Sequence, residues 1–295
     1  MTRTSLDAAA VEGYRRHGIH FPIRVMDATQ AAGLLGQLER TEAAFGGSLP
    51  SRINQKPHLV FPWLGELVRH PRILDAVESV LGPNVLCWGA QFFAKNGGDA
   101  SYVSWHQDAT YWGLSSPDVV TAWVALTPST VENGCMRVVP GTQHQQVAHT
   151  DTFAEANLLS RGQEVAVQVN EHDAVNVLLA PGEMSLHHVL ICHGSEPNRS
   201  AGRRVGFAIR YIPAHVYQTS GARESATLVR GTDTLGHFDH ELPPEGDMHP
   251  DAVARHAAIV DRHLARVYAG AAKPGKLGES VVSAAQTSSA QSSSV

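Results

Sequence analysis

From residue 85 onward the chain is divided into short segments rich in β-branched and aromatic residues, separated by turn sequences. The turn dipeptides are Asn133-Gly134, Pro140-Gly141 and Pro181-Gly182. Short runs of this composition between Gly and Pro turns are typical of β-strands. The expected strands span residues 85–93, 119–126, 136–139, 164–169, 174–179, 183–192 and 203–212.

The part of the chain before these strands has the periodicity of helices. The expected helices span residues 5–16, 27–44 and 71–81. Asp27 is a helix-capping residue, Pro71 suits a first helical turn, and Gly82-Pro83 ends the third helix. Helices followed by many short strands predict a mainly β fold with flanking helices, a double-stranded β-helix of the jelly-roll, cupin-like kind.

The length of 295 residues allows this fold to form one domain. We expect a single domain over residues 1–272, with a helical N-terminal part (about 1–82), a jelly-roll core (about 83–215) and a C-terminal helical extension (about 216–272). A last helix is expected at 255–268 and is interpreted as packing on the barrel. Residues 273–295 lack apolar periodicity and are predicted to be disordered.

Composition excludes several function classes. A formal net charge of −5 without a dense run of Lys and Arg argues against nucleic acid as the main partner. The sequence has no apolar run long enough for a membrane span and no secretory signal pattern at its N-terminus. Three widely spaced cysteines do not form a disulfide framework and favour a reducing compartment. We therefore expect a cytoplasmic protein acting on a small molecule, of undetermined oligomeric state.

His106-Gln107-Asp108 is the strongest chemical signal in the chain. In a strand, residues i and i+2 face the same side, so His106 and Asp108 can converge on one ion. His193, at the end of an apolar run that stops at Gly194-Ser195, is the best candidate for a second imidazole. Two histidines and one carboxylate form the facial triad of non-haem Fe(II) oxygenases, although a three-ligand zinc site has a similar donor set.

Two other histidines precede His193 in the same expected strand. His187 shares its face but lies six residues away, about 20 Å in an extended chain, so both cannot bind one ion. His188 faces the opposite side. Both are therefore excluded from the predicted triad.

Arg204 opens the last expected strand, eleven residues after His193. A planar guanidinium is suited to bidentate binding of a carboxylate. A buried arginine beside an iron triad is the expected anchor for a dicarboxylate cosubstrate, and its presence favours iron over zinc.

The motifs together resemble those of the phytanoyl-CoA dioxygenase family of Fe(II)/2-oxoglutarate-dependent oxygenases, over roughly residues 10 to 215. They occur in the family's order: Trp105-His106-Gln107-Asp108, Trp123 to Leu126, Glu132 to Gly141, His193-Gly194-Ser195, Asn198 and Arg204. The resemblance implies an oxygenase core with His106, Asp108 and His193 as iron ligands. It also implies that Arg204 and Ser195 hold the distal carboxylate of 2-oxoglutarate, with Trp123 and Gln91 as weaker candidates for lining that pocket. The cofactors implied are Fe(II), 2-oxoglutarate as cosubstrate and O2, with ascorbate supporting activity.

Related halogenases of this fold carry a small residue in place of the acid, so Asp108 favours hydroxylation over chlorination. The predicted reaction is hydroxylation of a C–H bond in a small polar metabolite (an amino acid, an aminophosphonate or a natural-product intermediate), with release of succinate and CO2. Tyr111, Trp112 and Arg210 are candidates for its pocket. Two alternatives remain: another 2-oxoglutarate-dependent oxidation (desaturation, ring chemistry or oxidation to a ketone), or a non-catalytic jelly-roll protein that binds a metal or ligand.

Overall fold

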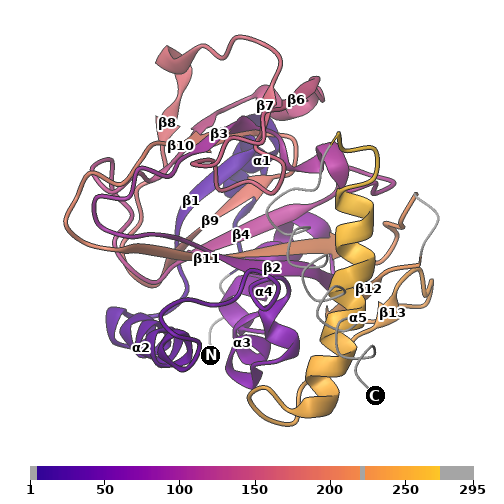
Figure 1. Ribbon diagram of the computed structural model, residues 1–295. Coiled ribbons are helices and arrows are strands. Elements are labelled where there is room, and N and C mark those ends of the chain that lie inside the picture. Colours follow the sequence, from indigo (N-terminus) through magenta and orange to yellow (C-terminus); the bar gives the residue numbers. More distant parts are fainter. Residues whose placement is uncertain (1–4, 220–222, 273–295) are drawn as a thin grey trace.

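Two β-sheets face each other in the computed structural model, which describes residues 5–219 and 223–272 (Figure 1). The larger sheet has, in spatial order, the strands β1 (Ile19–Arg24), β9 (Glu183–His188), β4 (Val120–Ala125), β11 (Arg204–Pro213), β2 (Val85–Lys95), β12 (Ser225–Arg230) and β13 (Asp239–His240). The smaller sheet has the order β3 (Val103–His106), β10 (Cys192–Ser195), β5 (Met136–Val139) and β8 (Val175–Asn176). Strand pairing is antiparallel except between β12 and β13. This is the predicted double-stranded β-helix.

Helices cover the outer face of the larger sheet (Figure 1). They are α1 (Ala8–His17), α2 (Ala28–Ala44), α3 (Pro62–Leu67) and α4 (Pro71–Leu81). Helix α2 begins with a capping box between Asp27 and Gln30, and α4 begins at Pro71 and ends at Gly82. Buried residues of these helices pack against side chains that β4, β9 and β11 direct outward. The large apolar area removed from water there fixes the sheet in place.

The last helix, α5 (Pro250–Val267), lies on the side of β12 and β13 and is drawn in yellow in Figure 1. It begins five residues before the helix predicted at 255–268, with Pro250 in its first turn. The expectation for residues 273–295 lies outside the described residues. Within the described ranges, no helix has the length and apolar character needed to cross a membrane.

The predicted strand at 183–192 is wrong, because the structure divides it into β9 and β10, which belong to different sheets. Residues 189–191 form a turn in which the Ile191 N–H donates to the His188 carbonyl (3.0 Å). Val189, Leu190 and Ile191 are all buried, so the turn has the composition of a strand. This crossing from one sheet to the other determines where His193 lies.

The sheets also extend beyond the expected core of residues 83–215. Strand β1 precedes that range and β12 follows it, and both join the larger sheet. The prediction also missed β3 and α3, and two expected strands are shorter: β7 (Gln163–Val165) pairs with β6 (His149–Asp151) in a separate ladder, and β8 has two residues. Four short 3-10 helices complete the described elements: Pro57–Leu59, Asp108–Tyr111, Thr142–His144 and Glu171–Asp173.

Candidate metal centre

His106, Asp108 and His193 come together between the two sheets. His106 is the last residue of β3 and lies opposite His193 in the neighbouring strand β10. Their ring centroids are 4.1 Å apart, and His106 Nε2 lies 3.4 Å from Asp108 Oδ1. One ligand atom from each residue lies within 4.8 Å of those of the other two. Among the described residues, this is the group of His, Cys, Asp and Glu side chains arranged to hold a metal ion.

Hydrogen bonds fix both imidazoles so that their Nε2 atoms are left for a metal. His106 Nδ1 lies 2.9 Å from the Ser104 carbonyl and 3.0 Å from the His193 carbonyl. His193 Nδ1 lies 3.0 Å from the Ile191 carbonyl. A carbonyl only accepts, so Nδ1 of each ring carries the proton and Nε2 is a free lone pair. Such outer hydrogen bonds orient metal-binding histidines.

Asp108 reaches the site because Gln107 keeps an extended backbone after β3 has ended. Asp108 itself begins a 3-10 helix, and its N–H donates to the carbonyl of Val189 (3.0 Å). The Gln107 side chain points away and donates to the carbonyls of Leu190 (2.6 Å) and Gln145 (2.8 Å). Gln107 therefore joins the motif to the turn that precedes His193, a role that the sequence analysis missed.

Electrostatics keep Asp108 and His193 in the protonation states that bind a cation. Burial alone would raise the pKa of Asp108, but the adjacent His106 imidazole (Nε2 3.4 Å from Oδ1) and the nearby positive charge of Arg210 hold it well below its usual range. Burial lowers the pKa of His193 well below its ordinary value. A carboxylate and neutral imidazoles on one side of a site form a donor set that fits Fe(II).

Arg204 and Trp123 form one wall of a small cavity of about 50 Å³ that the three candidate ligands also line. Arg204 is almost completely buried, donates from Nη1 to the Gly134 carbonyl (2.5 Å), and lies 5.4 Å from the Trp123 ring centroid. Its Nε–H has no acceptor among the described residues. Burial lowers the pKa of Arg204 to about 10, so it remains charged at neutral pH. This arginine is arranged to bind a carboxylate inside the barrel.

The Trp123 ring occupies its place because residue 206 has no side chain. A Cβ at Gly206 would lie 1.9 Å from Trp123 Cζ2. Gly206 sits between Arg204 and Ala208 on the inward face of β11, where small residues leave room for the small cavity.

Lys95 is a functional candidate that the sequence analysis missed. It is fully buried at the end of β2, directly opposite Arg204 in the sheet. Its ammonium donates to Ser195 Oγ (2.7 Å), so the Ser195 hydroxyl is already engaged. Burial, together with the charge of Arg204, lowers the pKa of Lys95 to about 7. The sequence signal that could have indicated Lys95 is the alternation of side chains along a strand, which puts Lys95 on the same face as Gln91. It was missed because the expected strand ended at residue 93.

His187 lies much closer to the centre than the sequence suggested. Its ring centroid is 5.0 Å from that of His193, so the expected separation of about 20 Å was wrong. The estimate assumed one continuous strand, whereas β9 places His187 in the larger sheet, facing His193 across the interior. His187 is outside the candidate ligand group but lines the small cavity, and burial lowers its pKa to about 4.

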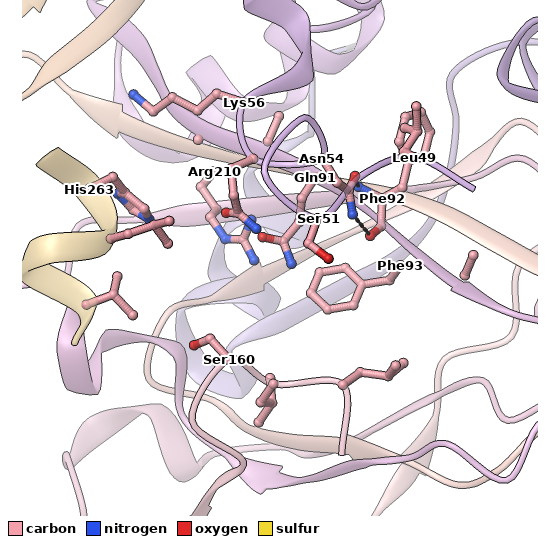
Figure 2. Close-up of a pocket in the computed structure, with 18 of the residues that line it drawn as sticks. Leu49, Ser51, Asn54, Lys56, Gln91, Phe92, Phe93, Ser160, Arg210 and His263 are labelled. Carbon is pink, nitrogen blue, oxygen red and sulfur yellow. Dashed lines mark hydrogen bonds between the residues drawn. The ribbon is translucent and has the colours of Figure 1, made fainter. Parts of the chain in front are cut away.

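A second cavity, of about 440 Å³ (Figure 2), shares Asp108 and Arg210 with the small one. Tyr111, Trp112 and Arg210 line it, as expected for substrate-pocket candidates. Gln91, by contrast, lines this cavity and is not among the residues around the small one. The Tyr111 hydroxyl donates to Asp151 (2.5 Å) and is therefore engaged.

The wall of this larger cavity also includes residues that the sequence did not indicate. Trp88 packs against Trp112 with ring centroids 4.9 Å apart, and Phe93 lies beside Gln91 and Arg210. His263 comes from α5, so the last helix forms part of the cavity as well as packing on the barrel. No pattern in residues 255–268 pointed to this role, because it depends on where the helix docks.

Comparisons with known proteins agree with this geometry. The family model described as phytanoyl-CoA dioxygenase (PhyH) matches residues 40–206. A probable alpha-ketoglutarate-dependent hypophosphite dioxygenase of Stutzerimonas stutzeri is 30% identical over 199 residues, which cover 64% of this chain and 68% of the relative. L-proline trans-4-hydroxylase of Streptomyces griseoviridis is 30% identical over 173 residues, covering 50% of this chain and 64% of the relative.

Among solved structures, the non-heme monooxygenase ThoJ in its apo form is 38% identical, with a TM-score of 0.78. The match covers 88% of this chain and 97% of that protein. The chain therefore belongs to the phytanoyl-CoA dioxygenase family of Fe(II)- and 2-oxoglutarate-dependent oxygenases.

Proposed function

We propose that this enzyme hydroxylates a C–H bond of a small polar metabolite and releases succinate and CO2. The observation that carries the proposal is that the candidate ligands line a small cavity with the buried Arg204, and that one of them, Asp108, also lines a second cavity large enough for a metabolite. A cavity of about 440 Å³ is within the usual range of small-molecule sites, roughly 300 to 1,000 Å³.

His106, Asp108 and His193 would hold Fe(II) on one side, leaving its other side toward the cavities. Arg204 would bind the distal carboxylate of 2-oxoglutarate, and Trp123 would support the guanidinium from its ring face. Lys95 would add a second positive charge, with Ser195 between it and the cavity. Bound Fe(II), 2-oxoglutarate and O2 supply the oxidising power that cleaves the C–H bond.

The remaining residues of the site position the substrate and exclude water. Trp88, Trp112 and Phe93 form an apolar wall of the larger cavity, while Gln91 and Arg210 offer hydrogen-bond donors. A few polar groups in an apolar wall orient a ligand. An amino acid, an aminophosphonate or a natural-product intermediate fits this lining, and the names of the two curated relatives, for hypophosphite and L-proline, are consistent with small polar substrates.

The test is succinate formation from 2-oxoglutarate by the purified protein with Fe(II), ascorbate and O2, with a panel of candidate substrates. His106→Ala should abolish substrate-dependent succinate formation and weaken Fe(II) binding, because only two ligands remain. The matched control is His172→Ala, which removes an exposed histidine far from the candidate ligands in the chain and should keep full activity. Equal activity of the His106→Ala variant and the parent would contradict the assignment, and absence of succinate with every compound would favour a binding protein.

Mass spectrometry of the product separates hydroxylation from the other oxidations. A mass increase of one oxygen atom indicates hydroxylation, whereas loss of two hydrogen atoms indicates desaturation or oxidation of an alcohol to a ketone. The second result would keep the enzyme class and change the reaction.

A further inference from the structure

Arg210 is a buried cation that forms no ion pair among the described residues, and the acid that interacts with it electrostatically is Asp108, itself a candidate metal ligand. It is 9% exposed, on the inward face of β11, and its guanidinium carbon lies 5.9 Å from the Phe93 ring centroid and 5.4 Å from that of Trp112. Among residues 5–219 and 223–272, no carboxylate lies within 4.0 Å of it, and its Nε–H has no acceptor. Figure 2 shows the side chain projecting into the larger cavity beside Gln91. A buried charge in this state needs compensation.

The other two cations that line the larger cavity are paired, which makes Arg210 different. Lys56 donates to Glu241 (2.5 Å) and to the Ser225 carbonyl (2.8 Å). Arg203 forms two hydrogen bonds with Glu42, of 2.6 and 2.7 Å. Arg210 is therefore the arginine of this cavity without an ion pair, and its compensating charge, Asp108, is the one that a bound metal would engage.

Arg210 is located on the substrate side of the candidate metal centre. It lies in one row across the larger sheet with His187, Thr121 and Gly89, and it lines both cavities, as Asp108 does. Arg204 is six residues away on the same strand face, about 20 Å in an extended strand. Both guanidinium side chains line the small cavity, but Arg204 does not line the larger one, so Arg210 is the arginine that can meet a ligand there while Arg204 holds 2-oxoglutarate.

The charges of the loaded site lead to the same conclusion. The charges of a ferrous ion and a 2-oxoglutarate dianion cancel, and the carboxylate of Asp108 offsets only one of the two positive charges of Arg204 and Arg210. One positive charge then remains in the loaded site, and Asp108 would share its own charge between the metal and Arg210. In a site shielded from water, an unbalanced cation strongly favours an anionic ligand.

We propose that Arg210 binds an oxyanion of the substrate, a carboxylate or a phosphonate, and so fixes which C–H bond faces the metal. This inference rests on the proposed function and assigns a charge class to the substrate. Gly89 leaves space beside the arginine, since a Cβ there would only touch Arg210 Cδ at 3.8 Å. The Gln91 amide offers a second donor next to the guanidinium.

The experiment uses calorimetric titration of the protein loaded with Ni(II), which does not activate O2, and with 2-oxoglutarate. The probes are indole-3-acetate, indole-3-acetamide and phenylphosphonate, whose rings suit the aromatic wall and which differ in charge. We expect at least one anion to bind roughly tenfold or more tighter than the neutral amide, the effect of a hydrogen bond to a charged group. Arg210→Gln should remove this preference, and Arg210→Lys should keep part of it. Arg24→Gln is the matched control and should keep the preference, because that arginine is paired with Glu183 and lines neither cavity.

Preference for the carboxylate or for the phosphonate supports the proposal and identifies the class of anion. Any one of three results would overturn the proposal. These are equal binding of indole-3-acetate and its amide, a preference for the anion that survives in Arg210→Gln, and no binding of either anion at millimolar concentration. Two further measurements test the proposed function separately: titration of 2-oxoglutarate alone, and succinate formation by the iron-loaded parent protein. Normal 2-oxoglutarate binding and turnover without an anion preference would reject only the role of Arg210.

Discussion

Replacement of Arg204 by lysine tests the cosubstrate site most directly. The Arg204 side chain is buried and donates from Nη1 to the Gly134 carbonyl, so its other N–H groups are available to a ligand carboxylate. Lysine keeps the charge but loses the planar fork, and with it at least one charge-assisted hydrogen bond. Such a bond contributes about 1.5 to 3 kcal/mol, which corresponds to a roughly tenfold to hundredfold weaker affinity for 2-oxoglutarate.

The assay is calorimetric titration of 2-oxoglutarate into Ni(II)-loaded protein, with metal binding measured separately. Metal affinity should be retained, because Arg204 is not among the three candidate ligands. Arg203→Lys is the matched control, since Arg203 is the preceding residue but pairs with Glu42 on the other side of the strand. An unchanged 2-oxoglutarate affinity in Arg204→Lys would refute the anchor and move attention to Lys95.

Three further predictions follow from the same geometry. Asp108→Ala should lose hydroxylation, and mass spectrometry should find little or no chlorinated product in chloride buffer. Asp108→Glu should lose activity on the order of 100-fold, because the carboxylate is displaced. Full hydroxylation by the alanine variant would show that Asp108 is not a metal ligand. Gly206→Ala should lower the free energy of unfolding by about 1 to 3 kcal/mol, measured by denaturant titration, because its Cβ would meet Trp123 at 1.9 Å. An unchanged midpoint of denaturant unfolding would mean that the Trp123 ring can move away. Lys95, whose pKa is lowered to about 7, is protonated below that pH and loses its charge as the pH rises, so the affinity for the 2-oxoglutarate dianion should fall above pH 7. Lys95→Met should flatten this dependence, and an identical pH profile in both proteins would contradict it.

The candidate ligands could be found in the sequence because their spacing is local. His106 and Asp108 lie two residues apart, and an extended Gln107 is enough to direct both toward one point. His193 and Arg204 followed from the composition of their strands and from the resemblance of their motifs. Alternation along the strand places Arg204 and Arg203 on opposite sides, so Arg204 lines the small cavity while Arg203 pairs with Glu42.

The position of His187 could not be obtained in this way. Residues 189–191 are buried and apolar, so they read as a strand, and only their hydrogen bonding shows a turn. That turn moves the chain from the larger sheet to the smaller one and brings His187 to within 5.0 Å of the His193 ring. A local pattern carries no information about a change of sheet.

The sequence by itself determined the helices that precede the sheets, the mainly β architecture and the residues suited to bind a metal, because these depend on periodicity and on short spacings. The tertiary structure decided which side chains share the interior. It placed Lys95 against Ser195, docked α5 so that His263 lines the larger cavity, and brought Arg210 close enough to Asp108 to lower the pKa of that carboxyl. These arrangements depend on contacts between segments far apart in the chain, and burial and charge balance exist only once those segments have packed together.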